Sequence, residues 1–132
     1  CRIQEPKTPQ QEMFKIAYPR QRSIVEESAC VILPYFKQKY SFDNQKNEYG
    51  LMDYGASWAL VENMLLAATA EGLGSVVHIP VKKESQQIRE FMKVLDGYYL
   101  PALVILGYAS KDALLPSQVE ATVEKKVHWN KW

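Results

Sequence analysis

The stretch from Asp53 to Pro80 constrains this fold most strongly, because about two thirds of it is one long apolar run with the signals of a helix. Asp is a residue type that caps helix N-termini, and Gly72 or Gly74 can supply the left-handed residue that ends a helix. Four polar residues interrupt the apolar surface between these ends: Ser57, Glu62, Asn63 and Thr69. A helix that is apolar nearly all round is buried on most sides. The sequence therefore predicts a long, buried central helix.

This run does not predict a membrane span, because Glu62 and Asn63 interrupt the roughly 20 consecutive apolar residues that a bilayer requires. The chain has 132 residues, of which 47% are hydrophobic and 23% charged, as in an ordinary globular protein. A net charge of +1 gives no reason to expect a nucleic acid partner. The sequence shows no signal peptide or acylation motif. We therefore expect a single domain over residues 1–132, located in the cytoplasm.

Two elements are expected before the long helix. Thr8 is a good N-cap and Pro9 suits the first helical position, so a helix should begin there and stop at Pro19. The apolar run Ala29–Leu33 predicts a strand covered on both faces. Within this strand, Cys30 is expected to be a small buried hydrophobic residue.

Three elements are expected after the long helix. Ser75–Ile79 reads as a short strand, and Tyr99–Tyr108 is the strongest strand of the chain. Between them lies a helix that begins near Glu84 and is ended by Gly97. Its apolar residues form a single stripe: Ile88, Phe91, Met92 and Leu95. Strands alternating with helices predict an α+β fold, an α/β sandwich whose central sheet is flanked by helices.

The segment Lys37–Gly50 is polar, with aromatic residues interleaved among charges. At this length it is either a mobile loop or a functional lid. Aromatic residues among positive charges can bind single-stranded nucleic acid. However, Asp43 and Glu48 lie in the same run, and we do not expect a nucleic acid partner.

Catalysis by side chains alone is not predicted. The sequence has no nucleophile elbow, no His-Glu-x-x-His, no Cys-x-x-Cys and no P-loop. His78 and His128 lie far apart in the chain and have no obvious partners. We therefore predict no catalytic side chain and no metal site, and an enzyme with this sequence needs a cofactor for the difficult step.

The order of these features resembles the nitroreductase family of FMN flavoproteins over roughly Val25 to Trp132. The resemblance rests on a capping Asp, an Ala/Leu-rich helix, a Gly-Leu-Gly-Ser turn and a short strand, followed by Gln86–Leu95, Pro101–Gly107 and the ending His-Trp-Asn-Lys-Trp. It implies a homodimer that binds FMN between its subunits. It also implies that the C-terminal tail, with Trp129 and Trp132, packs on the neighbouring subunit.

The resemblance also implies where the flavin lies. In the family, the segment just after the Gly-Leu-Gly-Ser turn lies beside the isoalloxazine ring, and a backbone N–H can donate to the flavin N5. Here that segment consists of Val77, His78, Ile79 and Pro80. Ile79 is the candidate for the N5 contact through its main chain, whereas Pro80 has no N–H and departs from relatives with Gly near this point. An ordinary edge strand without a ligand is the alternative.

Two departures from the family concern the FMN phosphate. Counting back from the aromatic ending places Gln118 and Glu120 where relatives often carry a Lys-x-Arg pair. Glu120 would repel a phosphate, although Lys125 and Lys126 could substitute if the register shifts. The chain also begins at Cys1, without the family's N-terminal segment, its Arg-rich phosphate motif and its Asn-Gln-Pro stretch. We expect either a fragment or a protein that lacks half of the usual cofactor site.

The function implied by the resemblance is an oxidoreductase that passes electrons from NAD(P)H through FMN to a nitroaromatic, a quinone or a similar acceptor. Two alternatives remain open. One is a non-catalytic flavin-binding protein of the same fold. The other is a dimeric interaction protein that has lost the cofactor.

Overall fold

The computed structural model describes residues 5–38, 49–113 and 122–131. The chain divides into two compact units, which are described separately. The larger unit is Ile24–Lys111 and the smaller comprises Cys1–Ser23 and Asp112–Trp132. In the smaller unit, the C-terminal segment contains a short 3-10 helix, η1 (Val123–Lys125).

Helix α1 (Pro9–Glu27) begins as predicted but does not stop at Pro19. The backbone N–H of Gln11 donates to Thr8 Oγ1 at 3.2 Å, which is the bond expected of an N-cap. The prediction that Pro19 ends the helix is wrong. Proline removes one backbone hydrogen bond and crowds the preceding turn, but the residues on both sides are good helix formers and continue the helix.

The larger unit is built on a three-stranded antiparallel sheet in the order β1 (Cys30–Ile32), β5 (Leu103–Gly107), β3 (Gly74–His78). Ile105 of β5 pairs with Val31 on one side and Val76 on the other. The predicted strand before Pro80 is confirmed, shifted by one residue. Because β5 is central and has neighbours on both sides, it supplies much of the core.

A second sheet has two short strands, β2 (Phe36–Lys37) and β4 (Tyr98–Tyr99), which pair antiparallel. The single strand predicted over Tyr99–Tyr108 is therefore divided into β4 and β5. Proline cannot donate to a sheet ladder, and Pro101 lies in the gap between the two strands. The predicted Lys37–Gly50 loop falls mostly on residues 39–48, outside the described residues.

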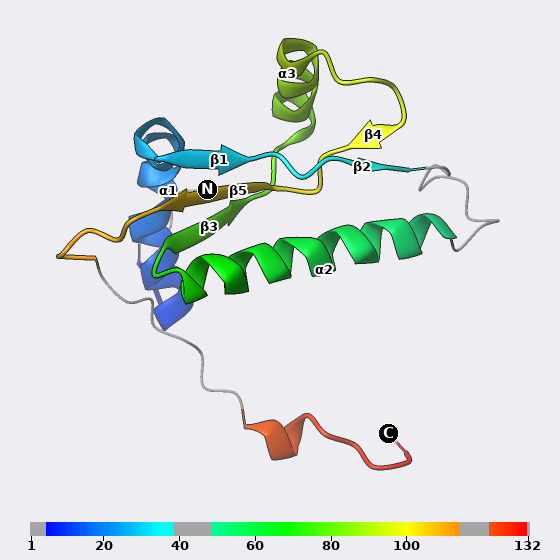
Figure 1. Cartoon of the computed structure of the whole chain (residues 1–132). Coiled ribbons are helices and arrows are strands. Elements are labelled where there is room, and N and C mark those ends of the chain that lie inside the picture. The colour runs from blue at the N-terminus through cyan, green and yellow to red at the C-terminus, as the bar shows by residue number, and fades with distance from the viewer. Residues whose placement is uncertain (1–4, 39–48, 114–121, 132) are drawn as a thin grey trace. The chain divides into compact units, whose positions relative to one another are not determined.

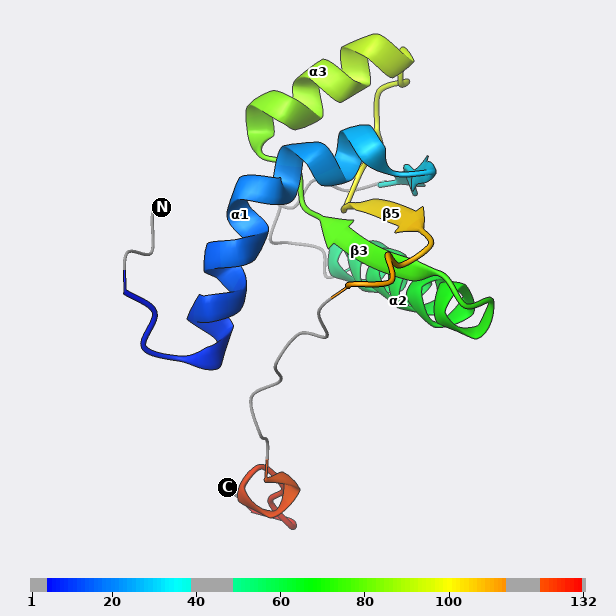
Figure 2. The ribbon, with the colours of Figure 1, turned by 90° about the vertical axis from the view of Figure 1, so that its left-hand side faces the viewer.

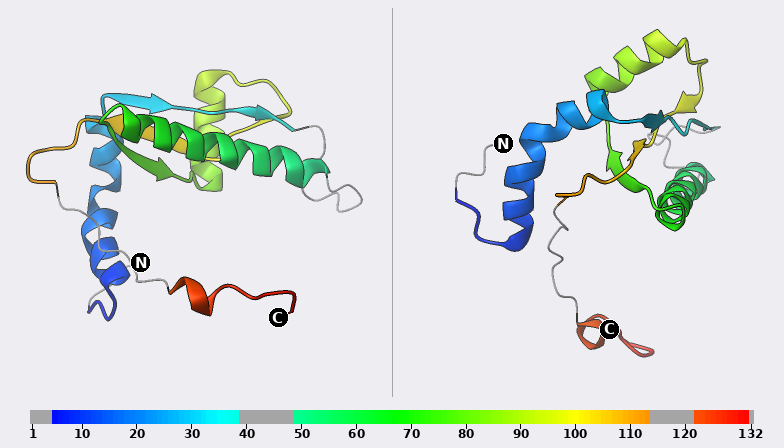
Figure 3. Two further views of the ribbon diagram at one scale, coloured as in Figure 1. Left: turned by 60° about the horizontal axis from the view of Figure 1, so that its bottom comes forward. Right: turned by 60° about the vertical axis from the view of Figure 1, so that its left-hand side comes forward.

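Helices α2 (Tyr49–Ala70) and α3 (Lys82–Met92) lie on opposite sides of the three-stranded sheet (Figures 1 and 2). Seen from the α2 side, this helix runs along the face of the sheet (Figure 3). The buried apolar residues come from α2, from β5 and from the residue just before β5: Val61, Ala68, Ala102, Leu103, Val104 and Ile105. The predicted α+β fold, with a sheet between helices, is confirmed.

The long helix begins earlier than predicted. It starts at Tyr49, so Asp53 lies inside the helix and is not its N-cap. Its end agrees with the prediction, because Gly72 adopts a left-handed φ of 73°. Gly72 N–H donates to Thr69 O at 3.0 Å and Leu73 N–H donates to Ala68 O at 2.8 Å, which is the Schellman arrangement.

The burial of α2 is one-sided, which differs from the expectation of a helix buried on most sides. The buried residues lie on one face: Gly50, Ser57, Val61 and Ala68. Large apolar side chains on the rest of the helix are exposed: Tyr49, Leu51, Met52, Tyr54, Leu60 and Leu66. The reason is that one sheet covers one face of the helix, and within the described residues the remaining apolar surface has no comparable layer against it.

The burial predicted for Cys30 is wrong. Cys30 is exposed, because it opens a three-residue strand at the edge of the sheet. The residues of the apolar stripe predicted after the strand are largely exposed as well: Phe91 is 85% exposed and Leu95 is also exposed. Helix α3 ends at Met92, before Leu95, because Lys93 adopts a left-handed φ of 51°. Gly97, with φ 80°, belongs to the turn that leads into β4.

Candidate functional site

The four residues predicted to contact a cofactor lie at the end of β3 and in its connection to α3. Val77 and His78 are the last two residues of β3 and pair with Val104 and Leu103 of β5. Ile79 and Pro80 follow as the connection. Val77, His78 and Pro80 are half-buried, whereas Ile79 is 61% exposed. The segment is thus held in the sheet at one end, and the side chain of Ile79 is exposed to solvent.

His78 has a partner that the sequence analysis missed. Its Nε2 atom lies 2.9 Å from Glu84 Oε1 and 3.0 Å from Glu84 Oε2. Glu84 Oε2 also accepts a hydrogen bond of 3.3 Å from the backbone N–H of Val81, the residue that caps α3. The expectation that His78 lacks a partner is wrong. The spacing of Glu84 three residues after Val81 could have indicated its bond to the start of α3, but it gives no signal for the bond to His78.

These contacts limit the main-chain donors that the turn can offer to a ligand. Pro80 has no N–H, and the N–H of Val81 already donates to Glu84. Among the three residues that follow β3, the N–H of Ile79 is therefore the donor to consider. Ile79 is also the residue that the sequence analysis chose, and its contact with a flavin stays a prediction.

At the other end of α3, Arg89 ties the helix to the chain that follows it. Its guanidinium group donates to the carbonyl oxygen of Tyr98 and, through Nη2, to Asp96 Oδ1 at 3.2 Å and to Leu95 O at 3.4 Å. Arginine suits this role because its donors are arranged in a rigid planar fork. Both ends of α3 are thus held by polar contacts.

Tyr35 lies close enough to Arg89 to interact with its charge. The Tyr35 hydroxyl is buried and has no hydrogen-bond partner among the described residues. Burial raises the pKa of Tyr35, because removal from water disfavours the phenolate, and the positive charge of Arg89 opposes this shift. The phenolate is therefore disfavoured in the folded protein relative to the unfolded chain.

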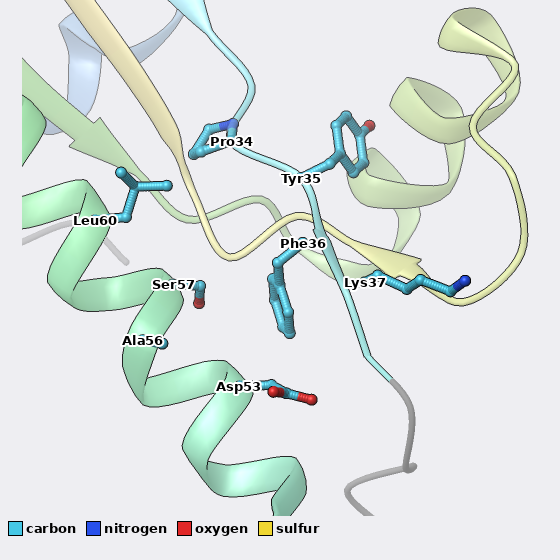
Figure 4. Close-up of a pocket in the computed structure, with 8 residues that line it drawn as sticks. All are labelled: Pro34, Tyr35, Phe36, Lys37, Asp53, Ala56, Ser57 and Leu60. Carbon is cyan, nitrogen blue, oxygen red and sulfur yellow. The ribbon is translucent and has the colours of Figure 1, made fainter.

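A hollow of about 280 Å³ lies between α2 and the segment that joins β1 to β2 (Figure 4). Phe36 points toward α2 and the ring of Tyr35 points the other way. The lining is mainly apolar, with Lys37 and Asp53 as its charged residues: Pro34, Tyr35, Phe36, Lys37, Asp53, Ala56, Ser57 and Leu60. None of the four predicted cofactor contacts lines it, so the hollow and the turn at Ile79 are distinct features.

The residues predicted to face the FMN phosphate give no structural test. Gln118 and Glu120 lie outside the described residues. Of the two possible substitutes, Lys126 is exposed and follows η1.

In the described ranges no three His, Cys, Asp or Glu side chains are grouped so that they could hold a metal ion. No helix in this part of the chain is both long enough and apolar enough to cross a membrane.

Comparison with known proteins identifies the fold. One similar solved structure is a putative NADH dehydrogenase/NAD(P)H nitroreductase from Bacteroides thetaiotaomicron, with a TM-score of 0.58 and 24% identity over 80% of this chain and 56% of that one. Another is a nitroreductase family protein from Streptococcus pneumoniae, with a TM-score of 0.51 and 18% identity over 95% of this chain and 51% of that one. The chain thus spans about half the length of each.

At these identities the two structures establish the fold alone. Comparison with curated proteins gives no match. The sequence model of the nitroreductase family, in contrast, matches residues 2–108, which is most of the chain. The chain therefore belongs to the nitroreductase family.

Proposed function

We propose that this chain forms part of an FMN-dependent oxidoreductase that takes electrons from NAD(P)H and passes them to a nitroaromatic, a quinone or a similar planar acceptor. The observation that carries the proposal is the family match over residues 2–108. When bound, FMN supplies the redox chemistry, and the protein supplies binding, orientation and electrostatics. This division agrees with a sequence that predicts no catalytic side chain of its own.

The residues around the turn fit the ring of a flavin. Ile79 and Val81 expose apolar side chains on either side of Pro80, which suits contact with a planar, largely apolar ring. The main-chain N–H of Ile79 is the donor we assign to the flavin N5. Because Pro80 cannot donate and Val81 donates to Glu84, a second main-chain contact from these residues is not expected.

We further propose that the protein is a homodimer and that the exposed face of α2 packs against the second copy. Leu66 is 59% exposed and Met52 66% exposed, and both are large apolar side chains of the same helix. Large contiguous apolar surfaces on a soluble protein mark interaction sites. Alanines on the same helix, such as Ala59 and Ala67, would allow close approach of a partner helix. Trp129, which is 84% exposed, is the residue of the C-terminal tail that we expect on the partner.

The dimer is tested by Leu66→Glu, which places a charge in the middle of this face. Sedimentation velocity of the wild type should give a dimer, and the variant should shift it toward the monomer. Gln86→Glu introduces the same side chain at another exposed position, on α3, and as the matched control it should leave the dimer intact. A wild-type protein that stays monomeric at high concentration would remove this part of the proposal.

The cofactor is tested by the visible absorbance spectrum of the purified protein, before and after incubation with excess FMN and dialysis. We expect a retained flavin band that NADH or NADPH bleaches in the absence of oxygen. The electron acceptor is then found by adding a nitroaromatic or a quinone and following the return of the band. No retained flavin in either sample would contradict the proposal.

A second candidate function is flavin binding without turnover. The observation that favours it is Pro80, which removes a possible main-chain donor next to the flavin. In that case the flavin band would be retained but neither nicotinamide nucleotide would bleach it. A third outcome, a stable dimer that binds no flavin, would favour an interaction protein.

Two further expectations, a single domain over residues 1–132 and a location in the cytoplasm, stay predictions from the sequence.

A further inference from the structure

We propose that Glu84 is a positioning residue for the turn at Ile79 and Pro80. By holding both ends of this turn, its carboxylate fixes the direction of the Ile79 main chain. The inference rests on the proposed function, because it is the flavin site that gives this direction a role. Glu84 itself would not contact the reacting atoms, and it would act through the backbone of the turn.

The contacts of Glu84 span the turn. One link joins its carboxylate to the ring of His78, the last residue of β3, at 2.9 and 3.0 Å. The other joins Oε2 to the N–H of Val81, just before α3, at 3.3 Å. The two residues between these points are Ile79 and Pro80. A single carboxylate therefore connects the chain immediately before the turn to the chain immediately after it.

The turn needs such a connection because its own backbone provides little. Pro80 has no N–H with which to close the turn by a backbone hydrogen bond. The neighbouring helix does not hold the turn by packing either, since α3 has no buried residue. A hydrogen bond of Ser85 N–H to Val81 O at 2.9 Å sets the first helical turn, but it does not reach back to β3. Among the described contacts, the link from β3 across the turn is made by Glu84.

A role in helix capping alone would not require the bond between Glu84 and His78. Capping needs an acceptor for the Val81 N–H, and glutamine serves this purpose as well as glutamate. The bond to His78 adds nothing to the cap, but it fixes the position of α3 relative to the end of β3. Both side chains are partly withdrawn from water, with 24% of the His78 side chain and 39% of the Glu84 side chain exposed. The pair therefore has a geometric effect that a purely capping residue would lack.

The test uses three variants, which remove both links, keep both links or leave Glu84 unchanged. Glu84→Ala removes both links, and Glu84→Gln keeps an acceptor for Val81 and a neutral hydrogen bond to His78. Glu90→Ala removes an exposed carboxylate from the same helix and is the matched control. Each variant is first compared with the wild type by far-UV circular dichroism, so that loss of folding is recognised before binding is measured.

The first readout needs no flavin and is the hydrogen exchange rate of the Val81 amide, measured by NMR. Loss of a protecting hydrogen bond should raise this rate about tenfold in Glu84→Ala. The rate should stay within about twofold of the wild type in Glu84→Gln, since the acceptor remains. It should not change in Glu90→Ala. An unchanged rate in Glu84→Ala would overturn the inference, because Glu84 would then not hold the turn.

The second readout is FMN binding, followed by flavin fluorescence and by the shape of the bound flavin band. If the wild type binds FMN, Glu84→Ala should bind it about tenfold more weakly and with an altered band, as removal of a supporting residue commonly does at a bound group. Glu84→Gln should restore both properties. Equal affinity and an identical band in Glu84→Ala would overturn the inference while leaving the proposed function standing. If the wild type binds no FMN, the proposed function fails, and with it the role of the turn.

Discussion

Helices α2 and α3 lie on opposite sides of the same sheet, but they are held by different forces. The inner face of α2 contributes Val61 and Ala68 to the core, next to β5. Helix α3 has no buried residue and is tied at its two ends by Glu84 and Arg89. Burial of apolar surface is non-directional, whereas hydrogen bonds demand a particular geometry.

This difference separates stability from positioning. We infer that α2 carries much of the folding free energy of the larger unit, because its contacts with the sheet are apolar and buried. Helix α3 contributes less to stability, but its polar contacts determine where the turn at Ile79 lies. The proposed flavin contact is thus on the side of the sheet where individual hydrogen bonds, and not packing, set the structure.

The largest effect that would sharpen this comparison is expected from Val61→Ala. Val61 is 1% exposed, and removing two methyl groups from a packed core costs the lost burial plus the cavity left behind, about 2–3 kcal/mol. The free energy of unfolding, measured by urea titration, should fall by this amount. A change below about 0.5 kcal/mol, the range of neutral surface substitutions, would show that α2 is not held by its packing.

The matched control for Val61→Ala is Leu66→Ala on the exposed part of the same helix. In the isolated chain this change should alter the unfolding free energy by less than about 0.5 kcal/mol, because Leu66 makes little contact there. If the protein is a dimer as proposed, Leu66→Ala should become destabilising as protein concentration rises. The dependence of this destabilisation on protein concentration therefore distinguishes a solvent-exposed apolar face from a subunit interface.

The next effect concerns the polar side of the sheet. Arg89→Ala should lower the unfolding free energy by about 1.5 kcal/mol, because hydrogen bonds from a charged donor to Tyr98 O and Asp96 are lost. Arg89→Lys keeps the positive charge but not the planar fork, so it should recover only part of this loss. Full recovery with lysine would mean that charge, and not hydrogen-bond geometry, holds this end of α3.

The two sides of the sheet also differ in how well the sequence predicts them. The apolar pattern of the long helix, its end at Gly72 and the strand before Pro80 could be recognised, because they follow from local spacing and residue conformation. The same pattern did not tell which face of α2 is covered, since that depends on how many layers surround the helix. The division of the Tyr99–Tyr108 run could have been anticipated from Pro101.

The polar contacts around the candidate site were largely hidden from the sequence. Glu84 was recognised as part of a helix start, but its bond to His78 depends on how the chain turns at Pro80. The spacing places Phe91 and Leu95 on one stripe of a helix, yet the helix ends before Leu95. Long-range pairs and helix ends of this kind depend on tertiary structure, whereas the position of Ile79 after the strand is a local property.

A smaller effect is expected at Gln38, which lies next to β2. Gln38 is 6% exposed, and both polar atoms of its side-chain amide are buried without a hydrogen-bond partner in the described ranges of the chain. Its backbone N–H donates to Gly97 O at 2.8 Å and would be kept in a variant. Gln38→Met keeps the length of the side chain and removes the unpaired amide, so it should stabilise the protein by about 1 kcal/mol. A lower urea midpoint in this variant would show that the amide has a partner in solution.

The smallest effect, Tyr35→Phe, tests the polar side through its pH dependence. The pKa of Tyr35 in the folded protein is raised above its usual value near 10 by burial. In alkali the unfolded chain therefore loses this proton first, and unfolding is favoured. Stability should be unaffected by Tyr35 below about pH 10 and should fall as pH rises from there toward the folded pKa.

Urea midpoints of the wild type and of Tyr35→Phe should therefore be compared from about pH 8 to about pH 11, on either side of the usual tyrosine pKa. At the lower pH the variant should be equal to the wild type or slightly more stable, because it removes a buried hydroxyl that makes no hydrogen bond within residues 5–38, 49–113 and 122–131. At the higher pH the wild type should lose stability that the variant keeps.

A second comparison, of Arg89→Ala with the double variant Tyr35→Phe/Arg89→Ala, extends the test. In Arg89→Ala the positive charge that opposes the shift is absent, so the pKa of Tyr35 should rise further. The loss of stability in alkali that depends on Tyr35 should therefore be larger than in the wild type. An unchanged loss would show that the charge of Arg89 does not act on Tyr35.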